Sequence, residues 1–389
     1  GGASDLPLRQ RTLRNAIQHS YALLDAFERR LLRCLGIFVG GCDLEQLAAV
    51  SAWGEEAAGR DLPLTLHSLV GKSLVRAQTT SEDSTRYLLL ETIREFALAQ
   101  VRAEGEEYAL RERHYAAFLD FWRRADNGLR GAEFLAWQAR VEPDLDNLRS
   151  ALQWTLAEGR FADTAWLILA AETYWFFTGK WQEGGRWIAR VLPHRNKLDL
   201  DLRLGLLLEV FSVGRGTEEL QPLEQYLDEL MRLMDSSQDT LMRAVGWNII
   251  AAMDVELADD RRERAIELSR AAFAEPEPAP EYGWIHDRDS VLAQHLWRYA
   301  DRRIEYGEFE RGAALLAECA AAYERRGATY AMGDVVGSQG RLALFQGEHE
   351  QALPLLETAV NAARRYRYLE TVGFLEPLLG YVILYRGDV

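Results

Sequence analysis

The consecutive residues Gly71, Lys72 and Ser73 are the best candidates for phosphate chemistry in this chain of 389 residues. A phosphate loop of the Gly-x-x-x-x-Gly-Lys-Ser type needs another glycine five residues before Gly71, because the backbone N–H groups of the whole turn cradle the phosphates. Leu66 stands at that position. The motif is incomplete, so we expect these residues to form the turn into a strand.

Other residues with reactive side chains do not group into a catalytic or metal site. The histidines are scattered without the spacing of zinc ligands, and no Gly-x-Ser-x-Gly elbow is present. Cys34, Cys42 and Cys319 fit neither a metal site nor a disulfide framework, which predicts buried, reduced thiols in a cytoplasmic protein. No apolar run approaches the roughly 18 residues that span a bilayer. The sequence predicts that this chain is not an enzyme and holds no metal or cofactor.

The negative charge of the chain is concentrated after residue 104. The net charge is −15, but residues 1–104 hold 12 Lys and Arg against 13 Asp and Glu, which leaves 33 basic and 47 acidic residues for the rest. DNA affinity depends largely on neutralised phosphates. A near-neutral domain attached to an acidic region is poorly suited to that, so direct DNA binding is not the expected function.

The N-terminal part predicts several short helices before a hairpin. Asp25 and Asp43 stand where helices begin, and Glu28 and Gln46 follow three residues later, which is the capping-box arrangement. Apolar spacing predicts helices over 12–24, 25–40, 43–50 and 64–69.

Two short apolar runs then predict strands at 73–77 and 87–90, on either side of a polar tip, 78–85. Ile93, Phe96, Ala97 and Val101 fall at helical spacing directly afterwards. Helices before and after two strands with a polar tip are typical of a winged-helix domain, here 9–104.

Several runs of this region resemble the winged-helix part of bacterial STAND-class signal-transduction ATPases, relatives of the maltose regulator MalT and of AfsR-type regulators. The runs are 12–25 (TLRNAIQHSYALLD), 31–41 (LLRCLGIFVGG), 68–75 (SLVGKSLV), 88–97 (LLLETIREFA) and, in the linker, 142–152 (EPDLDNLRSAL). The resemblance covers 9–160 closely and the later residues only in kind. It implies a nucleotide-binding domain, with ATP or ADP and magnesium, upstream of this chain. Residues 1–8 are expected to be a linker or a cloning remnant.

The same family often contacts nucleotide phosphates through a Met-His-Asp motif on the winged helix. Leu89, Leu90 and Glu91 occupy the matching positions here. Leu90 stands in place of the histidine and cannot donate a hydrogen bond to phosphate. Leu90 is instead predicted to lie in the core.

Residues 105–160 predict a helical arm, and residues 161–389 a tetratricopeptide-like α-solenoid, so the fold class is mainly α. Gly307, Gly347 and Gly387 recur every 40 residues, and Gly179 begins a similar segment. Small residues follow each internal turn glycine by five positions, at Gly184, Gly312 and Ala352. We expect these small residues where the two helices of a pair touch.

Stacked helix pairs curve around a concave surface, which the first helix of each pair lines. Counting back from the turn glycines places aromatic and charged residues on that surface, an arrangement that suits a ligand or peptide groove. The predicted binding residues are Trp247, Asp254, Gln294, Trp297, Asp301, Arg341 and Tyr381, with Trp166 and Thr173 near the same surface.

The resemblance implies a sensor and autoinhibitory region: the repeats bind a small-molecule or protein inducer, and the arm and winged helix hold the parent protein's own nucleotide-binding domain in its ADP-bound form. Inducer binding would then permit ADP/ATP exchange and oligomerisation. Two alternatives stay open, a constitutive protein-binding scaffold and a DNA-binding winged-helix regulator. Neither the inducer, the effector domain, the oligomeric state nor a contact of the winged helix with nucleotide follows from these residues, and no membrane partner is expected.

Overall fold

The chain forms two packed units that are described separately. The computed structural model describes residues 8–52, 61–79, 85–213, 217–253, 258–274, 287–366 and 369–386. The first unit consists of residues 1–121 and 140–160, and the second of residues 122–139 and 161–389. The segment 105–160, predicted as one arm, therefore contributes residues to both units.

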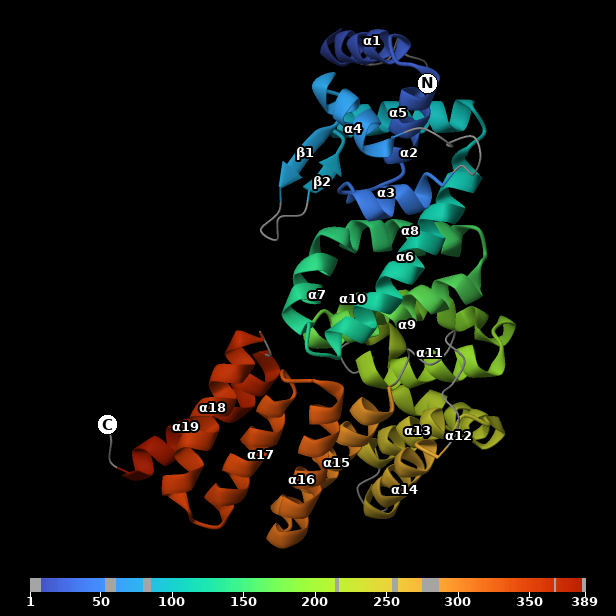
Figure 1. Cartoon of the computed structure of the whole chain (residues 1–389). Coiled ribbons are helices and arrows are strands. Elements are labelled where there is room, and N and C mark those ends of the chain that lie inside the picture. The colour runs from blue at the N-terminus through green and yellow to red at the C-terminus, as the bar shows by residue number, and fades with distance from the viewer. Residues whose placement is uncertain are drawn as a thin grey trace. The chain divides into compact units, whose positions relative to one another are not determined.

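Within its described residues, the first unit is mainly helical and contains one hairpin (Figure 1). Its elements are α1 (Leu8–Ala22), α2 (Ala26–Leu35), α3 (Leu44–Val50), α4 (Leu62–Gly71), β1 (Arg76–Thr79), β2 (Thr85–Leu88), α5 (Glu91–Ala103), the 3-10 helix η3 (Glu142–Asp144) and α8 (Leu145–Ala157). The helices α6 (Glu107–Leu129) and α7 (Phe134–Val141) have residues in both units. This order is that of a winged helix followed by helical segments.

Both predicted capping boxes form. Asp25 accepts the backbone N–H of Glu28 at 2.8 Å, and the Glu28 carboxylate accepts the N–H of Asp25 at 2.9 Å. Asp43 and Gln46 make the same reciprocal pair at the start of α3. Each box satisfies two N–H groups that a helix start leaves without intrahelical partners. The starts of α2 and α3 are thus fixed by local sequence.

The wing strands lie two to three residues from their predicted positions. They pair antiparallel, with Arg76 opposite Leu88 and Thr79 opposite Thr85. Ser73 has a left-handed backbone (φ 57°), so the chain is still turning where the first strand was predicted to begin. Leu90 already caps α5, so the second strand ends earlier than predicted. Residues 80–84 of the predicted tip lie outside the described residues.

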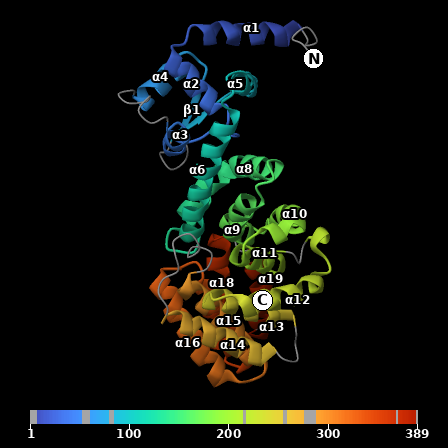
Figure 2. The ribbon, with the colours of Figure 1, turned by 90° about the vertical axis from the view of Figure 1, so that its right-hand side faces the viewer.

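The second unit is an array of helices. They are α9 (Phe161–Phe177), α10 (Trp181–Val191), α11 (Leu200–Val213), α12 (Leu227–Ser236), α13 (Thr240–Met253), α14 (Ala258–Ala272), α15 (Arg288–Glu305), α16 (Phe309–Arg326), α17 (Met332–Phe345), α18 (His349–Arg365) and α19 (Leu369–Arg386), with short 3-10 helices η4 (Leu192–Lys197), η6 (Glu218–Leu220) and η7 (Leu223–Tyr226). Neighbouring helices pack as antiparallel pairs, and the pairs α13–α14 and α15–α16 stack on each other (Figure 2).

The repeat signals predicted from the sequence have clear physical causes. Gly307 and Gly347 have φ of +79° and +80° at the turns that follow α15 and α17, a conformation that favours glycine. At Gly312 a Cβ would lie 2.6 Å from the side chain of Ile304, so only glycine lets α15 and α16 approach so closely. Ala352 is fully buried at the matching position of α18.

The three cysteines are buried free thiols, as predicted. Burial raises the pKa of Cys34 to about 12, so this thiol is protonated and unreactive at neutral pH. Among the helices that the structure describes, none is both long enough and apolar enough to cross a membrane.

Candidate functional site

Arg86 on β2 ties the wing to the segment that precedes α8. Its Nε donates to the carbonyl of Gly40 at 2.8 Å, and its Nη2 donates to the carbonyls of Gly41 and Pro143 at 2.9 Å and to Asp144 Oδ1 at 2.7 Å. Arg86 and Asp144 are buried, at 9% and 2% exposure. A buried ion pair is tolerated only when its other donors and acceptors are also satisfied. The three carbonyls meet that requirement, so the strand, the glycine turn and the linker are held together.

Asn147 extends the same network by one helical turn. Its Nδ2 donates to the carbonyl of Gly41 at 2.9 Å and to Asp144 Oδ1 at 3.0 Å, and its Oδ1 accepts the N–H of Val39 at 2.8 Å. Gln46 Nε2 donates to Asp144 Oδ2 at 2.6 Å. The linker segment quoted above for its family resemblance therefore acts as a set of hydrogen-bonding groups for the winged helix.

His114 on α6 completes this network. Its Nε2 lies 3.3 Å from Asn147 Oδ1, and its ring packs on Phe118 with centroids 4.5 Å apart. Burial lowers the pKa of His114 to about 4, so the ring is neutral at pH 7 and donates from Nε2. Arg86, Asp144, Asn147 and His114 were not predicted as site residues. The available signal was an arginine at the wing and an Asp-Leu-Asp-Asn run in the linker.

The exposed face of α4, which winged helices commonly present to DNA, has little positive charge. Leu64 is 66% exposed, and Pro63 and His67 are also on the surface. Lys72, at the end of α4, forms an ion pair with Glu28. Phosphate binding needs cations that are free to replace counterions. The described part of this face therefore offers few unpaired cations to a DNA backbone.

Leu90 does not lie in the core, so that prediction was wrong. Its side chain is 62% exposed, and its extended backbone (φ −61°, ψ 143°) makes it the residue that precedes α5. The inward face of α5 starts at Ile93 and continues with Phe96 and Ala97, all buried. Leu90 faces away from them and leaves the first N–H groups of α5 without a side-chain cap.

Three of the predicted binding residues come together between α15 and α17. Trp297 Nε1 donates to Ser338 Oγ at 2.9 Å. Arg341 forms ion pairs with Asp301 at 2.8 Å and with Glu305 at 3.1 Å. Burial raises the pKa of Asp301, and the opposing Arg341 guanidinium and Ser338 hydroxyl limit that rise. The polar groups of Trp297 and Arg341 are thus engaged within the protein, and Ser338 and Glu305 were not predicted.

The other predicted residues are dispersed. Trp247 and Gln294 are half-buried on α13 and α15, and Tyr381 on α19 is 55% exposed, near Tyr385 and His349. Asp254 lies outside the described residues. Trp166 is half-buried beneath the Arg123 guanidinium, which is 5.5 Å from its ring. A role in ligand binding for these residues stays a prediction.

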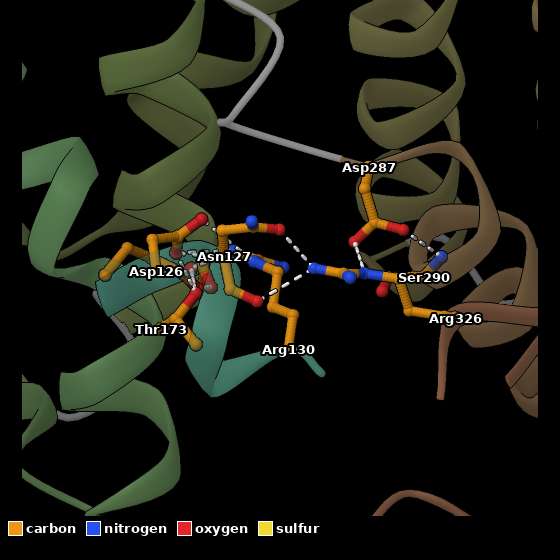
Figure 3. A network of polar contacts seen from close by, with 9 residues as sticks. Asp126, Asn127, Arg130, Thr173, Asp287, Ser290 and Arg326 are labelled. Atoms are coloured by element: carbon orange, nitrogen blue, oxygen red, sulfur yellow. Dashed lines mark hydrogen bonds and ion pairs between the residues drawn. The ribbon is translucent and has the colours of Figure 1, made fainter. Parts of the chain in front are cut away.

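Thr173 belongs to a polar network that joins the arm residues of the second unit to its first helix (Figure 3). Its hydroxyl donates to Asp126 Oδ1. Arg130 Nη2 donates to Glu172 Oε2 at 3.0 Å, and Arg130 Nε pairs with Asp126 Oδ2 at 3.2 Å. Asp126 and Thr173 are almost fully buried. The end of α6 is therefore anchored to α9 by buried charges.

A second branch of the network reaches a later helix pair (Figure 3). Arg326, at the end of α16, donates from Nη2 to the Asn127 carbonyl at 2.8 Å and to Asn127 Oδ1. Its Nε lies 3.4 Å from Asp287 Oδ2, while Asp287 Oδ1 accepts the N–H of Ser290 as the cap of α15. Asn127 and Asp126 are neighbours, so one turn of α6 contacts both α9 and the α15–α16 pair.

Aromatic rings make the same connection. Phe134, 1% exposed at the start of α7, stacks on Tyr330 (centroids 4.8 Å) and contacts Phe177 of α9 (5.4 Å) and Tyr366 after α18 (5.7 Å). Phe177 also contacts Tyr330 at 5.2 Å. We call Phe134, Phe177, Tyr330 and Tyr366 the aromatic clasp. Within the second unit, it brings the first helix of the array against its later helices.

The anchor of α6 contains more acid than base. Burial raises the pKa of Asp126 to about 6, with Arg130 opposing the rise. Burial also raises the pKa of Glu209, on α11, well above its usual range, and the nearby Glu172 raises it further. Both shifts favour the protonated form of these carboxyl groups. In the part of the chain that the structure describes, no His, Cys, Asp and Glu residues group as a metal site would require.

Comparisons with known proteins agree with these observations. The family described as "Winged helix-turn-helix domain" matches residues 24–102. Proteins of Mycobacterium bovis and Mycobacterium tuberculosis, named as candidate HTH-type transcriptional regulators, are 38% identical over 297 residues, covering 70% of this chain and 32% of their own. An uncharacterized M. bovis protein is 33% identical over 114 residues, or 29% of each chain. The chain thus spans about a third of the length of the curated relatives it matches.

A solved structure extends the likeness to nearly the whole chain. It is a STAND (Signal Transduction ATPase with Numerous Domains) protein with a tetratricopeptide repeat sensor from Pyrococcus horikoshii, with a TM-score of 0.53 and 15% identity, covering 95% of this chain and 56% of that one. This chain therefore contains a winged-helix domain followed by a helical repeat array, and its fold is similar to that of part of this STAND protein.

Proposed function

We propose that this chain is the sensor and autoinhibitory region of a STAND signal-transduction ATPase. Its repeat array binds an inducer at the concave face, and the arm and winged helix relay this event to a nucleotide-binding domain, where ADP is exchanged for ATP and oligomerisation follows. We place the protein in the cytoplasm. The parent protein is the enzyme, and this chain regulates it.

The arm supports this proposal most directly. Helix α6 is continuous, and its residues 107–121 belong to the winged-helix unit while 122–129 belong to the repeat unit. At one end His114 joins the Arg86–Asp144 network, and at the other Asp126 and Asn127 join the array. A continuous helix with a buried polar contact in each unit, at His114 and at Asp126, is suited to transmit a displacement.

An inducer can act only through a difference in affinity. It must bind the active form more tightly than the inhibited form, because equal affinity shifts no equilibrium. The first test is calorimetric titration of this chain with candidate inducers. The second measures ADP release from a longer protein that contains the nucleotide-binding domain, with and without the inducer that binds. Binding that leaves ADP release unchanged would contradict the relay.

Arg86 gives this test a matched pair of variants. Arg86→Lys keeps the charge but loses the fork that holds four acceptors. We expect it to leave inducer affinity unchanged and to reduce the effect of the inducer on ADP release. Arg94→Lys is the control, because Arg94 pairs with Glu91, whose side chain is 65% exposed. Equal behaviour of the two variants would remove Arg86 from the relay.

DNA binding by the winged helix is a second candidate, favoured by the family match over 24–102 and by the names of the mycobacterial relatives. Its test is a gel shift at several salt concentrations, because phosphate contacts make the affinity fall steeply with salt. A salt-sensitive shift would support this candidate. The low charge on the described face of α4 leads us to expect none.

A further inference from the structure

A groove with a volume of about 360 Å³ lies between α17 and α18, next to the aromatic clasp. One wall is the first half of α17, and the other is the second half of α18, whose lining residues recur at helical spacing. The lining residues that matter here are Met332, Val336, Thr358, Asn361, Ala362 and Arg365. This volume is at the lower end of the range of small-molecule sites, so it suits a single ring or a short acyl chain.

The walls divide into an apolar and a polar part. Met332, Val336 and Ala362 supply aliphatic surface. Arg365 and Asn361 are exposed at the C-terminal end of α18 and offer N–H donors there. The arrangement fits a molecule with an apolar body and one group that accepts hydrogen bonds.

Arg365 indicates that the hydrogen-bond acceptor of the ligand is negatively charged. Its guanidinium lies 5.7 Å from the Tyr366 ring centroid, and among the described residues it has no carboxylate partner. The neighbouring Arg364 pairs with Glu376 at 2.6 Å, and Arg341 pairs with two carboxylates. In a chain of net charge −15, a cation left unpaired beside an apolar groove is complementary to an anion. A carboxylate matches the guanidinium fork through two parallel hydrogen bonds.

We infer that this groove binds a small monocarboxylate with an apolar body, such as an aromatic or short-chain acid, with the carboxylate on Arg365. Tyr366 lines the groove and also contacts Phe134. A ligand bound in the groove therefore changes the packing of the aromatic clasp. The inference rests on the proposed function, because it names a ligand class and a sensing position for the same array. The position differs from the Trp297–Asp301–Arg341 cluster.

The test titrates this chain with phenylacetate, hexanoate and phenylacetamide by calorimetry. Phenylacetamide has the same body as phenylacetate without its charge. We expect both acids to bind and the amide to bind at least about tenfold more weakly, since a hydrogen bond to a charged group contributes more than a neutral one. Equal binding of amide and acid, or no binding of either acid at millimolar concentration, would overturn the inference.

Variants locate the site. Arg365→Gln should reduce phenylacetate affinity by about tenfold or more, whereas Arg364→Gln should leave it unchanged, because Arg364 does not line the groove. Thr358→Trp, at an exposed groove position, should block both acids without disturbing the core. Equal losses in Arg364→Gln and Arg365→Gln would refute the assigned site.

Failure of the proposed function and failure of the groove as a binding site give different results. Phenylacetate would then bind this chain with the Arg365 dependence described, while ADP release from the longer protein stayed constant. Loss of the Arg365 dependence, in contrast, refutes the groove whatever happens to ADP release.

Discussion

His295 is a buried histidine whose protonation opposes folding. Its Nδ1 lies 2.8 Å from Ser269 Oγ, and burial lowers its pKa to about 3. The ordinary pKa of histidine is 6.5. Between pH 6.5 and pH 3, His295 is therefore protonated in the unfolded chain but neutral in the folded chain. The stabilisation from neutral His295 is complete above pH 6.5 and is lost as the pH falls.

When the pH falls from 7 to 5, we expect protonation of His295 in the unfolded chain to lower the free energy of unfolding by about 2 kcal/mol. His295→Asn has a side-chain amide, which does not titrate and can still donate a hydrogen bond to the Ser269 hydroxyl, so it should show a smaller loss. The measurement is urea denaturation of both proteins at the two pH values. Asp126, with its pKa raised to about 6, changes stability in the opposite direction, but it is common to both proteins and cancels. Identical pH slopes would contradict the assignment.

Two glycines of the repeat array distinguish backbone strain at a turn from helix propensity within a helix. Gly347 and Gly373 both have open space where a Cβ would be, but Gly347 has φ +80° at a turn while Gly373 lies inside α19. Gly347→Ala should lower stability by about 1 kcal/mol, because alanine is strained at positive φ. Gly373→Ala should raise it by roughly 0.5–1 kcal/mol through helix propensity.

Thermal denaturation of the two single variants checks this prediction, and their opposite signs are its decisive feature. A loss of stability in Gly373→Ala would mean that the open face of α19 is covered in solution.

The elements show how far local sequence determines structure. Asp25 and Asp43 form their capping boxes because all the groups involved lie within three residues. The wing strands were displaced because Ser73 turns where an extended residue was expected. Leu90 was misassigned because an apolar residue next to a helix start can face either way, and its neighbours in space decide.

At the scale of the whole molecule, the aromatic clasp governs how the array holds the arm. Phe134→Ala removes a side chain that is 1% exposed, and such a truncation typically costs about 3–5 kcal/mol. We expect local rather than global loosening, seen as faster amide hydrogen exchange over 127–137. In the longer protein of the proposed function, the same variant should raise basal ADP release.

A second variant and a control test whether the faster exchange comes from loss of the contacts that hold the arm. Arg326→Gln should act in the same direction, because it removes the ion pair with Asp287 and weakens the bonds to Asn127. Phe273→Ala, a truncation at an exposed position directly after α14, should leave exchange over 127–137 unchanged. Unchanged exchange in both Phe134→Ala and Arg326→Gln would show that the clasp does not hold the arm.

The sequence by itself determined the features that depend on a helical period, a cap or a turn: the winged helix, the repeat pairs and the turn glycines at Gly307 and Gly347. The tertiary structure alone decided which charges meet. Arg86 pairs with Asp144, which is 58 residues later in the sequence. Arg326 binds Asn127, which is 199 residues earlier. With 45 basic and 60 acidic residues, spacing cannot select one pair, because a partner is set by the packing of whole helices. For the same reason the groove beside Arg365 became visible only in the folded chain.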